Sequence, residues 1–257
     1  MGMLSDLQNI PRVMRGRGWL NGARLLEIWF SRPAAAAPAY GPPDTSTIRM
    51  DGWALTFQRA RTVYDQMIQE HIWSNPAGRI EVATMLRRKG LLTTVPQTQK
   101  FGALSDPVLL QDLDYINQRA VGDYHTFDDM TAALGRFNFR VVVAGTVAAV
   151  PQLPGAAPLA GGWNVEVAEV GVYVRDSFDF DGNQYLGCWS DDGFIPLMPP
   201  SYGEGYAPSE PVCSPVGNRN FRDWRSQHGH GGDFLVYSDL KRVSLNPPDR
   251  FVVTLRT

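Results

Sequence analysis

The hydrophobic periodicity of the chain changes near Gly135, and this change constrains the fold more than any other feature. Before Gly135, large apolar residues recur every three or four positions, as in the segment from Gly18 to Phe30, which is the spacing of a helix with one buried face. From Phe137 to Val143 every second residue is large and apolar, which is the period of a strand. The pattern predicts an α+β fold, with a helical N-terminal half followed by a mainly antiparallel β-sheet or open half-barrel in the C-terminal half.

The same change divides the chain into two predicted regions. Residues 1–134 form the predicted helical region, with a proline-rich linker at 33–43, and residues 135–257 form a β-rich region in which we expect the catalytic residues. In the first region, helices are predicted at 18–30, 53–71, 77–89 and 106–116, with a short helix from 126. In the second, strands are predicted at 164–180, 184–189, 234–243 and 251–255, with long loops at 151–162 and 190–220.

The net charge and the hydropathy of the chain argue against a nucleic-acid partner and against a transmembrane segment. A net charge of −2 argues against a nucleic-acid partner, because proteins that bind a phosphate backbone carry a clear basic excess. The sequence contains no run of about 18 apolar residues, so we expect no stable transmembrane segment. The N-terminus lacks the apolar core of a signal peptide, which predicts synthesis in the cytoplasm without a classical export route.

The chain has two cysteines, Cys188 and Cys213. They could form one bridge in an oxidising compartment, but two cysteines are too few for a disulfide framework, and we expect two free thiols. Cys188 stands in Gly187-Cys188-Trp189, a triplet similar to the surroundings of papain-like nucleophiles, which leaves a thiol hydrolase open as a minor hypothesis. Its predicted place inside a strand favours a buried structural cysteine instead.

A cluster of aspartates at a predicted strand end is the first candidate site. Five aspartates lie between Asp176 and Asp192, and grouped carboxylates can bind a hard cation such as Mg²⁺ or raise one another's pKa for acid–base work. In an extended strand Asp176 and Asp179 face opposite sides, so a shared site requires a bend between them. An alternative that is compatible with the site is a hairpin turn at Asp181-Gly182 between two paired strands. The predicted metal ligands are Asp176, Asp179 and Asp181.

The segment 218–234 is the second candidate, because it gathers arginines, histidines and glycines. If it is helical, residues 222, 225 and 228 align on one face, where arginine can hold a phosphate and histidine can move a proton. A solvated amphipathic helix that buries Phe221 and Trp224 explains the same spacing, and both interpretations stay open. The candidate residues are Arg222, Arg225, His228, His230 and Asp233.

Four segments carry a resemblance to a known family: Gly171 to Phe180, Tyr185 to Trp189, Phe221 to Arg225 and Gly231 to Asp239. They look like a proteobacterial domain family associated with type VI secretion and polymorphic toxins, and the resemblance covers nearly the whole chain. It implies an antibacterial effector that is secreted without a signal peptide and delivered to the periplasm of a target cell. It also implies two protein partners, a cognate immunity protein and a secretion-spike or chaperone protein.

A narrower resemblance concerns Asp176-x-Phe178-Asp179-Phe180, which is similar to the Asp-x-Tyr-Asp-Phe core of colicin M-like bacteriocins. Those enzymes cleave lipid II, the lipid-linked precursor of peptidoglycan, with help from Mg²⁺, and have a helical region before an open β-rich catalytic domain. The resemblance implies that Asp176 and Asp179 are the catalytic or metal-binding pair, with Phe178 in place of the family's tyrosine.

The chain departs from that family six residues after Asp179, where Tyr185-Leu186 replaces a His-Arg pair. Arg225 and His228 could substitute for the pair if the later segment folds back against the strand end. The predicted catalytic set is Asp176, Asp179, Arg225 and His228.

Two classes of function follow from these features. In the first, the chain is an antibacterial hydrolase that cleaves a phosphodiester or pyrophosphate bond in a lipid-linked envelope precursor, with Mg²⁺ as the expected cofactor. In the second, it is a non-enzymatic or membrane-permeabilising effector or adaptor that acts through its aromatic helices. Exposure of Trp19, Trp29 and Phe30 would favour the second class, whereas burial of all three would make them core residues.

Overall fold

The computed structural model describes residues 3–38, 41–93, 97–122, 126–150, 162–196 and 213–254. The chain forms two compact units, and each unit is assembled from three separate stretches of sequence. Unit 1 consists of Met1–Thr47, Gly122–Phe137 and Asp176–Val236, and unit 2 consists of Ile48–Val121, Asn138–Arg175 and Tyr237–Thr257. The predicted division of the chain after residue 134 falls inside unit 1.

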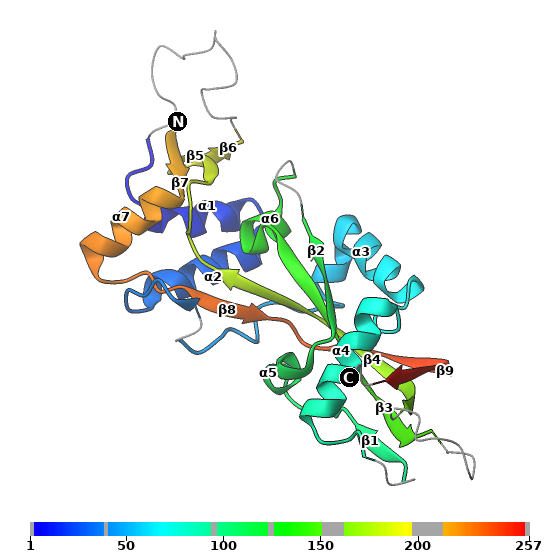
Figure 1. The fold of residues 1–257 in the computed structure, drawn as a ribbon. Helices are drawn as coiled ribbons and strands as arrows, with labels where there is room; N and C mark the ends of the chain where they lie inside the picture. The colour runs from blue at the N-terminus through cyan, green and yellow to red at the C-terminus, as the bar shows by residue number, and fades with distance from the viewer. Residues whose placement is uncertain are drawn as a thin grey trace, which may run out of the picture. The chain divides into compact units, whose positions relative to one another are not determined.

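Unit 1 contains several short helices (Figure 1). The α2 helix confirms the helix predicted at 18–30 and packs against α1 and α6. Its contact with α6 is close because Gly22 has no side chain: a Cβ atom there would lie 2.7 Å from the Cβ atom of Ala132. The backbone N–H of Gly22 also donates to the Asp129 carboxylate at 2.9 Å, which ties the two helices together. The helices of unit 1 are η1 (Leu7–Asn9), α1 (Ile10–Gly16), α2 (Leu20–Ser31), α6 (Asp129–Leu134) and α7 (Asn218–His228).

Unit 1 also contains a small antiparallel sheet in the order β6-β5-β7. Its strands are β5 (Tyr185–Ser190), β6 (Gly193–Ile195) and β7 (Ser214–Gly217). The α7 helix follows β7 directly and ends at Gly229, whose φ of 66° places it in the left-handed conformation typical of a helix C-terminus. The sheet occupies part of the predicted loop 190–220, of which 197–212 lies outside the described residues, as does 151–161 of the other predicted loop.

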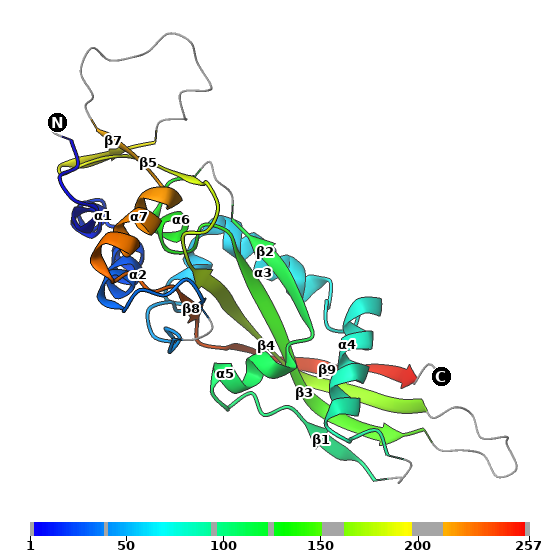
Figure 2. The ribbon, with the colours of Figure 1, turned by 60° about the vertical axis from the view of Figure 1, so that its left-hand side comes forward.

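The larger sheet has six strands, and most of it belongs to unit 2 (Figure 2). Strands β1 and β2 both pair with β3, β3 pairs with β4, and β4 pairs with β8 and β9. The pairings of β1 with β3, β3 with β4 and β4 with β9 are antiparallel. The strands are β1 (Gln99–Phe101), β2 (Asn117–Val121), β3 (Phe137–Ala149), β4 (Gly162–Phe178), β8 (Phe234–Tyr237) and β9 (Lys241–Thr254).

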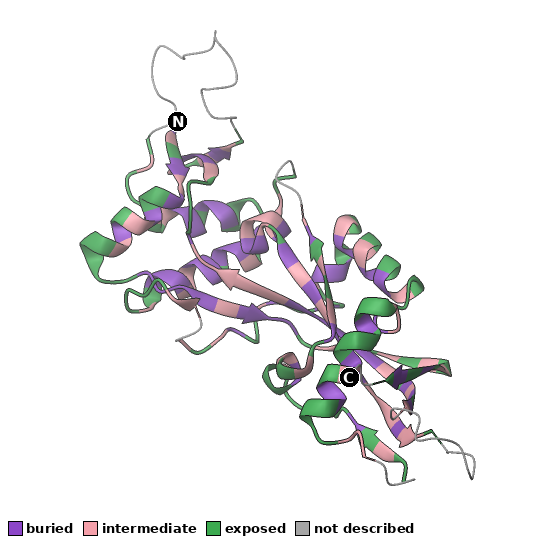
Figure 3. Cartoon of the chain, in the orientation of Figure 1, coloured by how far each residue is buried: buried purple, intermediate pink, exposed green. Residues whose placement is uncertain are grey.

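Helices of unit 2 pack on its strands, with α3 against β2 and α4 against β9. The side chain of Asn75 accepts a hydrogen bond from the N–H of Gly78 at 2.8 Å and caps α4, which Pro76 opens. Buried apolar residues of β3 and β4, among them Phe139 and Val172, form the core of unit 2. Buried positions are purple in Figure 3. The helices of unit 2 are η3 (Ala54–Thr56), α3 (Gln58–Gln69), α4 (Pro76–Arg88), α5 (Val108–Gln111) and η4 (Asp112–Asp114).

The predicted fold class, with helices in the first half and a sheet or half-barrel in the second, is wrong. Helices and strands are interspersed: β1 and β2 lie in the N-terminal half, α7 lies between two strands of the C-terminal half, and there is a second sheet. The short strands were missed because β1 and β2 each bury a single apolar side chain, Phe101 or Val121, and so lack an alternating pattern. Their backbone hydrogen bonds come from pairing with β3, which local sequence does not reveal.

The hairpin predicted at Asp181-Gly182 is also wrong. Gly182 lies in a turn with a φ of 69°, but the flanking strands β4 and β5 belong to different sheets and do not pair. Among the described residues, no helix is long and apolar enough to cross a membrane.

Candidate functional site: an aromatic cavity in unit 1

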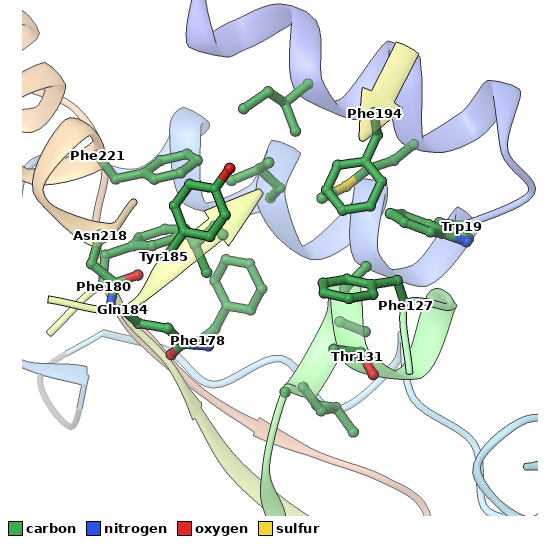
Figure 4. Close-up of a pocket in the computed structure, with 18 of the residues that line it drawn as sticks. Trp19, Phe127, Thr131, Phe178, Phe180, Gln184, Tyr185, Phe194, Asn218 and Phe221 are labelled. Carbon is green, nitrogen blue, oxygen red and sulfur yellow. The ribbon is translucent and has the colours of Figure 1, made fainter. Parts of the chain in front are cut away.

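A cavity of about 570 Å³ lies within unit 1, and all of its lining residues belong to that unit. Its walls come from α1, α2, α6, the end of β4, the strands β5 and β6, and α7. The side chains that line it are mainly apolar, and they include Trp19, Phe127, Phe178, Tyr185, Phe194 and Phe221 (Figure 4). A concave apolar site of this size that also carries a few polar groups is typical of pockets that bind small molecules.

Asp176 and Asp179 both line this cavity. Strand β4 ends at Phe178, so the strict alternation of side chains stops before Asp179 and the two carboxylates can share one site. None of the described residues that line the cavity is a lysine, arginine or histidine.

The pKa of the half-buried Asp179 is raised, mainly because burial disfavours its charged form. The N–H of Asp181 donates to its Oδ1 atom at 3.5 Å and lowers the pKa, the charge of Asp181 raises it, and the charge of Arg225 lowers it. Among these effects burial is the largest, so Asp179 holds a proton to a higher pH than an exposed aspartate does.

The α7 helix is held against the turn that follows Asp179. The ring of Phe221 stacks on Phe180 with the ring centroids 3.9 Å apart. The Nη1 atom of Arg222 donates to the carbonyl oxygens of Phe180 and Gly182, each at 2.6 Å. Asn218 donates to the carbonyl oxygen of Asp181. The Arg222 side chain therefore binds backbone carbonyl groups of the turn. The alternative of an amphipathic helix with buried Phe221 and Trp224 is confirmed.

Arg225 and Asp233 form a buried ion pair beside Asp179. The Arg225 side chain is 11% exposed and that of Asp233 is 1% exposed. The indole Nε1 of Trp29 donates to the same carboxylate at 2.8 Å, and the Arg225 guanidinium lies 5.3 Å from the centre of a Trp29 ring. Burial raises the pKa of Asp233 most, the Trp29 hydrogen bond and Arg225 lower it, and the charge of Asp179 raises it. The fold thus brings the segment that contains Arg225 and Asp233 back against the strand end.

The remaining predicted site residues lie elsewhere. His228 is exposed, its ring stacks on Trp224 with centroids 4.3 Å apart, and its Nδ1 lies 2.8 Å from the Trp224 carbonyl oxygen. His230 and Asp181 are exposed as well, and neither lines the cavity. Asp176 and Asp179 line the cavity, and Asp179 is coupled by charge to the ion pair of Arg225 with Asp233. His228, His230, Asp181 and Arg222 do not line the cavity.

The expected Mg²⁺ site was predicted on Asp176, Asp179 and Asp181. Asp176 and Asp179 line the cavity, whereas Asp181 is exposed and does not line it. In the described part of the chain, no group of three or more histidine, cysteine, aspartate or glutamate side chains is placed to hold a metal ion.

The expectation of free thiols is wrong, because Cys188 and Cys213 form a disulfide. Pairing of β5 with β7 sets Cys188 opposite Pro215 and so places Cys213, just before β7, within reach. Both cysteines are buried, and the bridged Cys188 has no thiolate to act as a nucleophile. The hypothesis of a thiol hydrolase loses its basis.

The aromatic residues of the first helices are core residues. Trp19 is 8% exposed, Trp29 is fully buried and Phe30 is 8% exposed. Sequence reasoning missed that Trp29 binds Asp233 and that Trp19 lines the cavity. The only signal was an excess of aromatic residues in the segment 18–30, which does not reveal a partner two hundred residues away.

Comparison with known proteins places the chain in one family. Neither the curated proteins nor the solved structures give a match. Residues 5–253 match a family model described as a family of unknown function (DUF6402). Since the match spans nearly all of the sequence, the chain belongs to this family.

Proposed function

We propose that the chain is an antibacterial effector that hydrolyses a lipid-linked precursor of the cell envelope, with the reaction at the Asp176 and Asp179 end of the aromatic cavity. The observation that carries this proposal is the pairing of a large apolar cavity with three aspartates among its lining residues, of which Asp176 and Asp179 stand together at the end of β4. The apolar wall suits the lipid chain of such a precursor, and its phosphate would lie at the aspartate end of the cavity.

Asp179 is the proposed general acid. The bond that breaks joins phosphorus to the leaving oxygen, and the bond that forms joins phosphorus to a water oxygen. Asp179 gives its proton to the leaving oxygen, because its raised pKa keeps it protonated to a higher pH. Asp176 takes the proton that the attacking water loses. A protonated Asp179 also avoids placing a second negative charge against the phosphate.

Arg225 is a positioning residue in this scheme. Its guanidinium is bound to Asp233, so it does not clamp phosphate directly. Its charge beside Asp179 limits how far the pKa of that carboxyl rises. The predicted role of Arg225 as a phosphate ligand is therefore replaced by an electrostatic role toward the acid.

The direct test is turnover of purified lipid II in detergent, in buffer that contains Mg²⁺. We expect the wild-type chain to release the phosphorylated headgroup, and Asp179→Asn to lower the rate by a factor on the order of a hundred or more, as for loss of a general acid. Asp192→Asn is the matched control, because Asp192 is exposed and does not line the cavity. An inert wild-type chain, or an Asp179→Asn variant as fast as wild type, would contradict the proposal.

Delivery and partners belong to the same proposal. A type VI effector of this class acts in the target periplasm, and its producer needs an immunity protein. We expect the chain to stop bacterial growth when it is directed to the periplasm, and Asp179→Asn to be harmless there at equal protein levels. Equal toxicity of the two would argue for a non-enzymatic effector.

A further inference from the structure

The disulfide of unit 1 joins two strands next to residues that line the cavity. Cys188 lies in β5 beside Trp189, which lines the cavity, and Cys213 directly precedes β7. The ring of Phe194, another lining residue, packs on the backbone of Gly187, where it leaves no room for a side chain. Its centroid lies 4.6 Å from that of Trp189. The position of β5 therefore sets the position of these two rings in the cavity wall.

The pairing of β5 with β7 is short and irregular. β7 has four residues, and the register of the pair shifts between Tyr185 and Gly187. Pro215 stands opposite Cys188 and has no N–H to donate to the ladder. Cys188 and Cys213 are 25 positions apart in the sequence, so holding the two strands together costs loop-closure entropy. The disulfide offsets this cost, because a bridged chain has less freedom to lose on folding.

The other end of β7 is held without the bridge. The α7 helix begins immediately after β7, and the N–H of Asn218 donates to the carbonyl oxygen of Gln184 at 2.9 Å. The ring of Phe221 stacks on Phe180. Loss of the bridge therefore leaves α7 in place and frees the Cys213 end of β7, together with the β5 and β6 residues beside it.

The turn between β5 and β6 is also bound by polar contacts. The Oδ1 atom of Asp191 accepts from the N–H of Ser5 at 3.2 Å and from the side chain of Asn9 at 2.9 Å. The Nη2 atom of Arg12 donates to the Asp191 carbonyl oxygen at 2.6 Å. The contacts of Ser5 and Arg12 are exposed to solvent, where water competes for them, so they contribute much less than a covalent bridge does.

We propose that the bridge between Cys188 and Cys213 is a redox switch that completes the cavity wall only in an oxidising compartment. In a reducing cytoplasm both cysteines are thiols, and the Cys213 end of β7 separates from β5. In an oxidising compartment a protein or small-molecule disulfide, R–S–S–R, accepts two electrons from the two thiols. Its S–S bond breaks, the bond between Cys188 and Cys213 forms, and the two thiol protons pass to the two R–SH products.

Burial gives this switch a direction. Cys188 is 4% exposed and Cys213 is 5% exposed in the bridged form, so an external thiolate does not reach either sulfur atom while the sheet is closed. In the reduced form the Cys213 end is open and an oxidant reaches it. The bridge is therefore formed readily and reduced slowly. The consequence for activity rests on the proposed function, whereas the consequence for the cavity wall does not.

Hydrogen exchange of the full chain, measured by mass spectrometry without any substrate, tests the switch. The samples are bridged wild type, wild type refolded in dithiothreitol, and the double variant Cys188→Ser with Cys213→Ser. We expect the amides of 185–195 and 214–217 to exchange faster in the second and third samples by a factor on the order of ten or more, because the strands lose the bridge that joins them. The amides of α2 and β3 should exchange alike in all three samples.

Two further observations complete the test. Dithiothreitol should not change the exchange of the double variant, which has no bridge to lose. Iodoacetamide should alkylate both cysteines of the refolded, reduced wild type at a rate close to that of free cysteine. Equal exchange of 185–195 in bridged and reduced wild type, cysteines that resist iodoacetamide in the reduced form, or a loss of protection that extends through α2 would each overturn the switch, because the switch loosens only the small sheet.

Turnover of lipid II in detergent separates this inference from the proposed function. If the bridged chain cleaves lipid II, the reduced wild type and the double variant should be slower by a factor on the order of ten or more, because a smaller fraction of molecules has the complete cavity. Equal rates of the bridged and reduced proteins would overturn the control of activity by the bridge. If the bridged chain is inert, the proposed function fails, and the exchange result still decides whether the bridge completes the wall.

Discussion

At the scale of single residues, Asp179 is both half-buried and the proposed general acid. Burial raises its pKa in the folded state, whereas an unfolded aspartate titrates near about 3.9. Between the pKa of Asp179 in the unfolded chain and its higher pKa in the folded state, the folded protein binds more protons than the unfolded chain. The stability that this proton contributes is complete below the unfolded pKa and is lost as pH rises through the folded pKa.

Asp179→Asn should therefore raise the melting temperature at neutral pH and leave it unchanged near about pH 4, because asparagine resembles the protonated acid at every pH. Thermal melts of both proteins across that pH range measure the effect. Asp192→Asn should give no such pH-dependent gain. A variant that is less stable than wild type at neutral pH would show that ionised Asp179 stabilises the fold.

Burial raises the pKa of Asp233 as well, but its carboxylate is the partner of a buried guanidinium, so we expect Asp233→Asn to destabilise the fold. Asp233→Asn leaves a buried guanidinium without its partner, which costs about 3–5 kcal/mol. Asp223→Asn offers the comparison, because that carboxylate is 60% exposed and lies 3.6 Å from Arg219, a surface pair worth about 0–1 kcal/mol. Urea unfolding at neutral pH measures the free energy of unfolding of both variants. Equal losses of this free energy would contradict the view that burial of the ion pair decides how much its removal costs.

At the scale of secondary structure, the disulfide holds the small sheet of unit 1 closed. It joins β5, which carries the cavity residues Tyr185 and Trp189, to the residue before β7. The double variant Cys188→Ser with Cys213→Ser should lose about 2–4 kcal/mol of stability.

Dithiothreitol should then lower the melting temperature of the wild type and not that of the double variant. Thiol titration of the denatured, unreduced wild-type chain is the direct check. Finding two free thiols there would contradict the bridge.

Some elements were predictable from sequence and others were not, for physical reasons. The helix at 18–30 and the strand from Phe137 were visible because each buries a regular face. The strands β1 and β2 were invisible because pairing with β3, not local pattern, stabilises them. At the site, the sequence marked Asp176 and Asp179 as candidates, and both line the cavity. The contact of Trp29 with Asp233 could not be predicted, since these residues meet only through tertiary packing.

At the scale of the whole molecule, the two units are interleaved along the sequence. A division after residue 134 would separate α6 from the α7 helix and the small sheet, which belong to the same unit. We expect the fragments 1–134 and 135–257 to remain largely unfolded when each is made alone. Circular dichroism melts test this, and a cooperative transition in either fragment would contradict it.

In the proposed mechanism, Asp179 promotes cleavage of a phosphate ester in a lipid-linked precursor. The most direct measurement is the ³¹P NMR spectrum of purified lipid II during incubation with the full chain, followed in parallel with Asp179→Asn. We expect the wild-type chain to convert the pyrophosphate resonances into those of cleaved products, and the variant to leave them unchanged over the same time. Unchanged resonances with wild type, or equal conversion by both proteins, would contradict it.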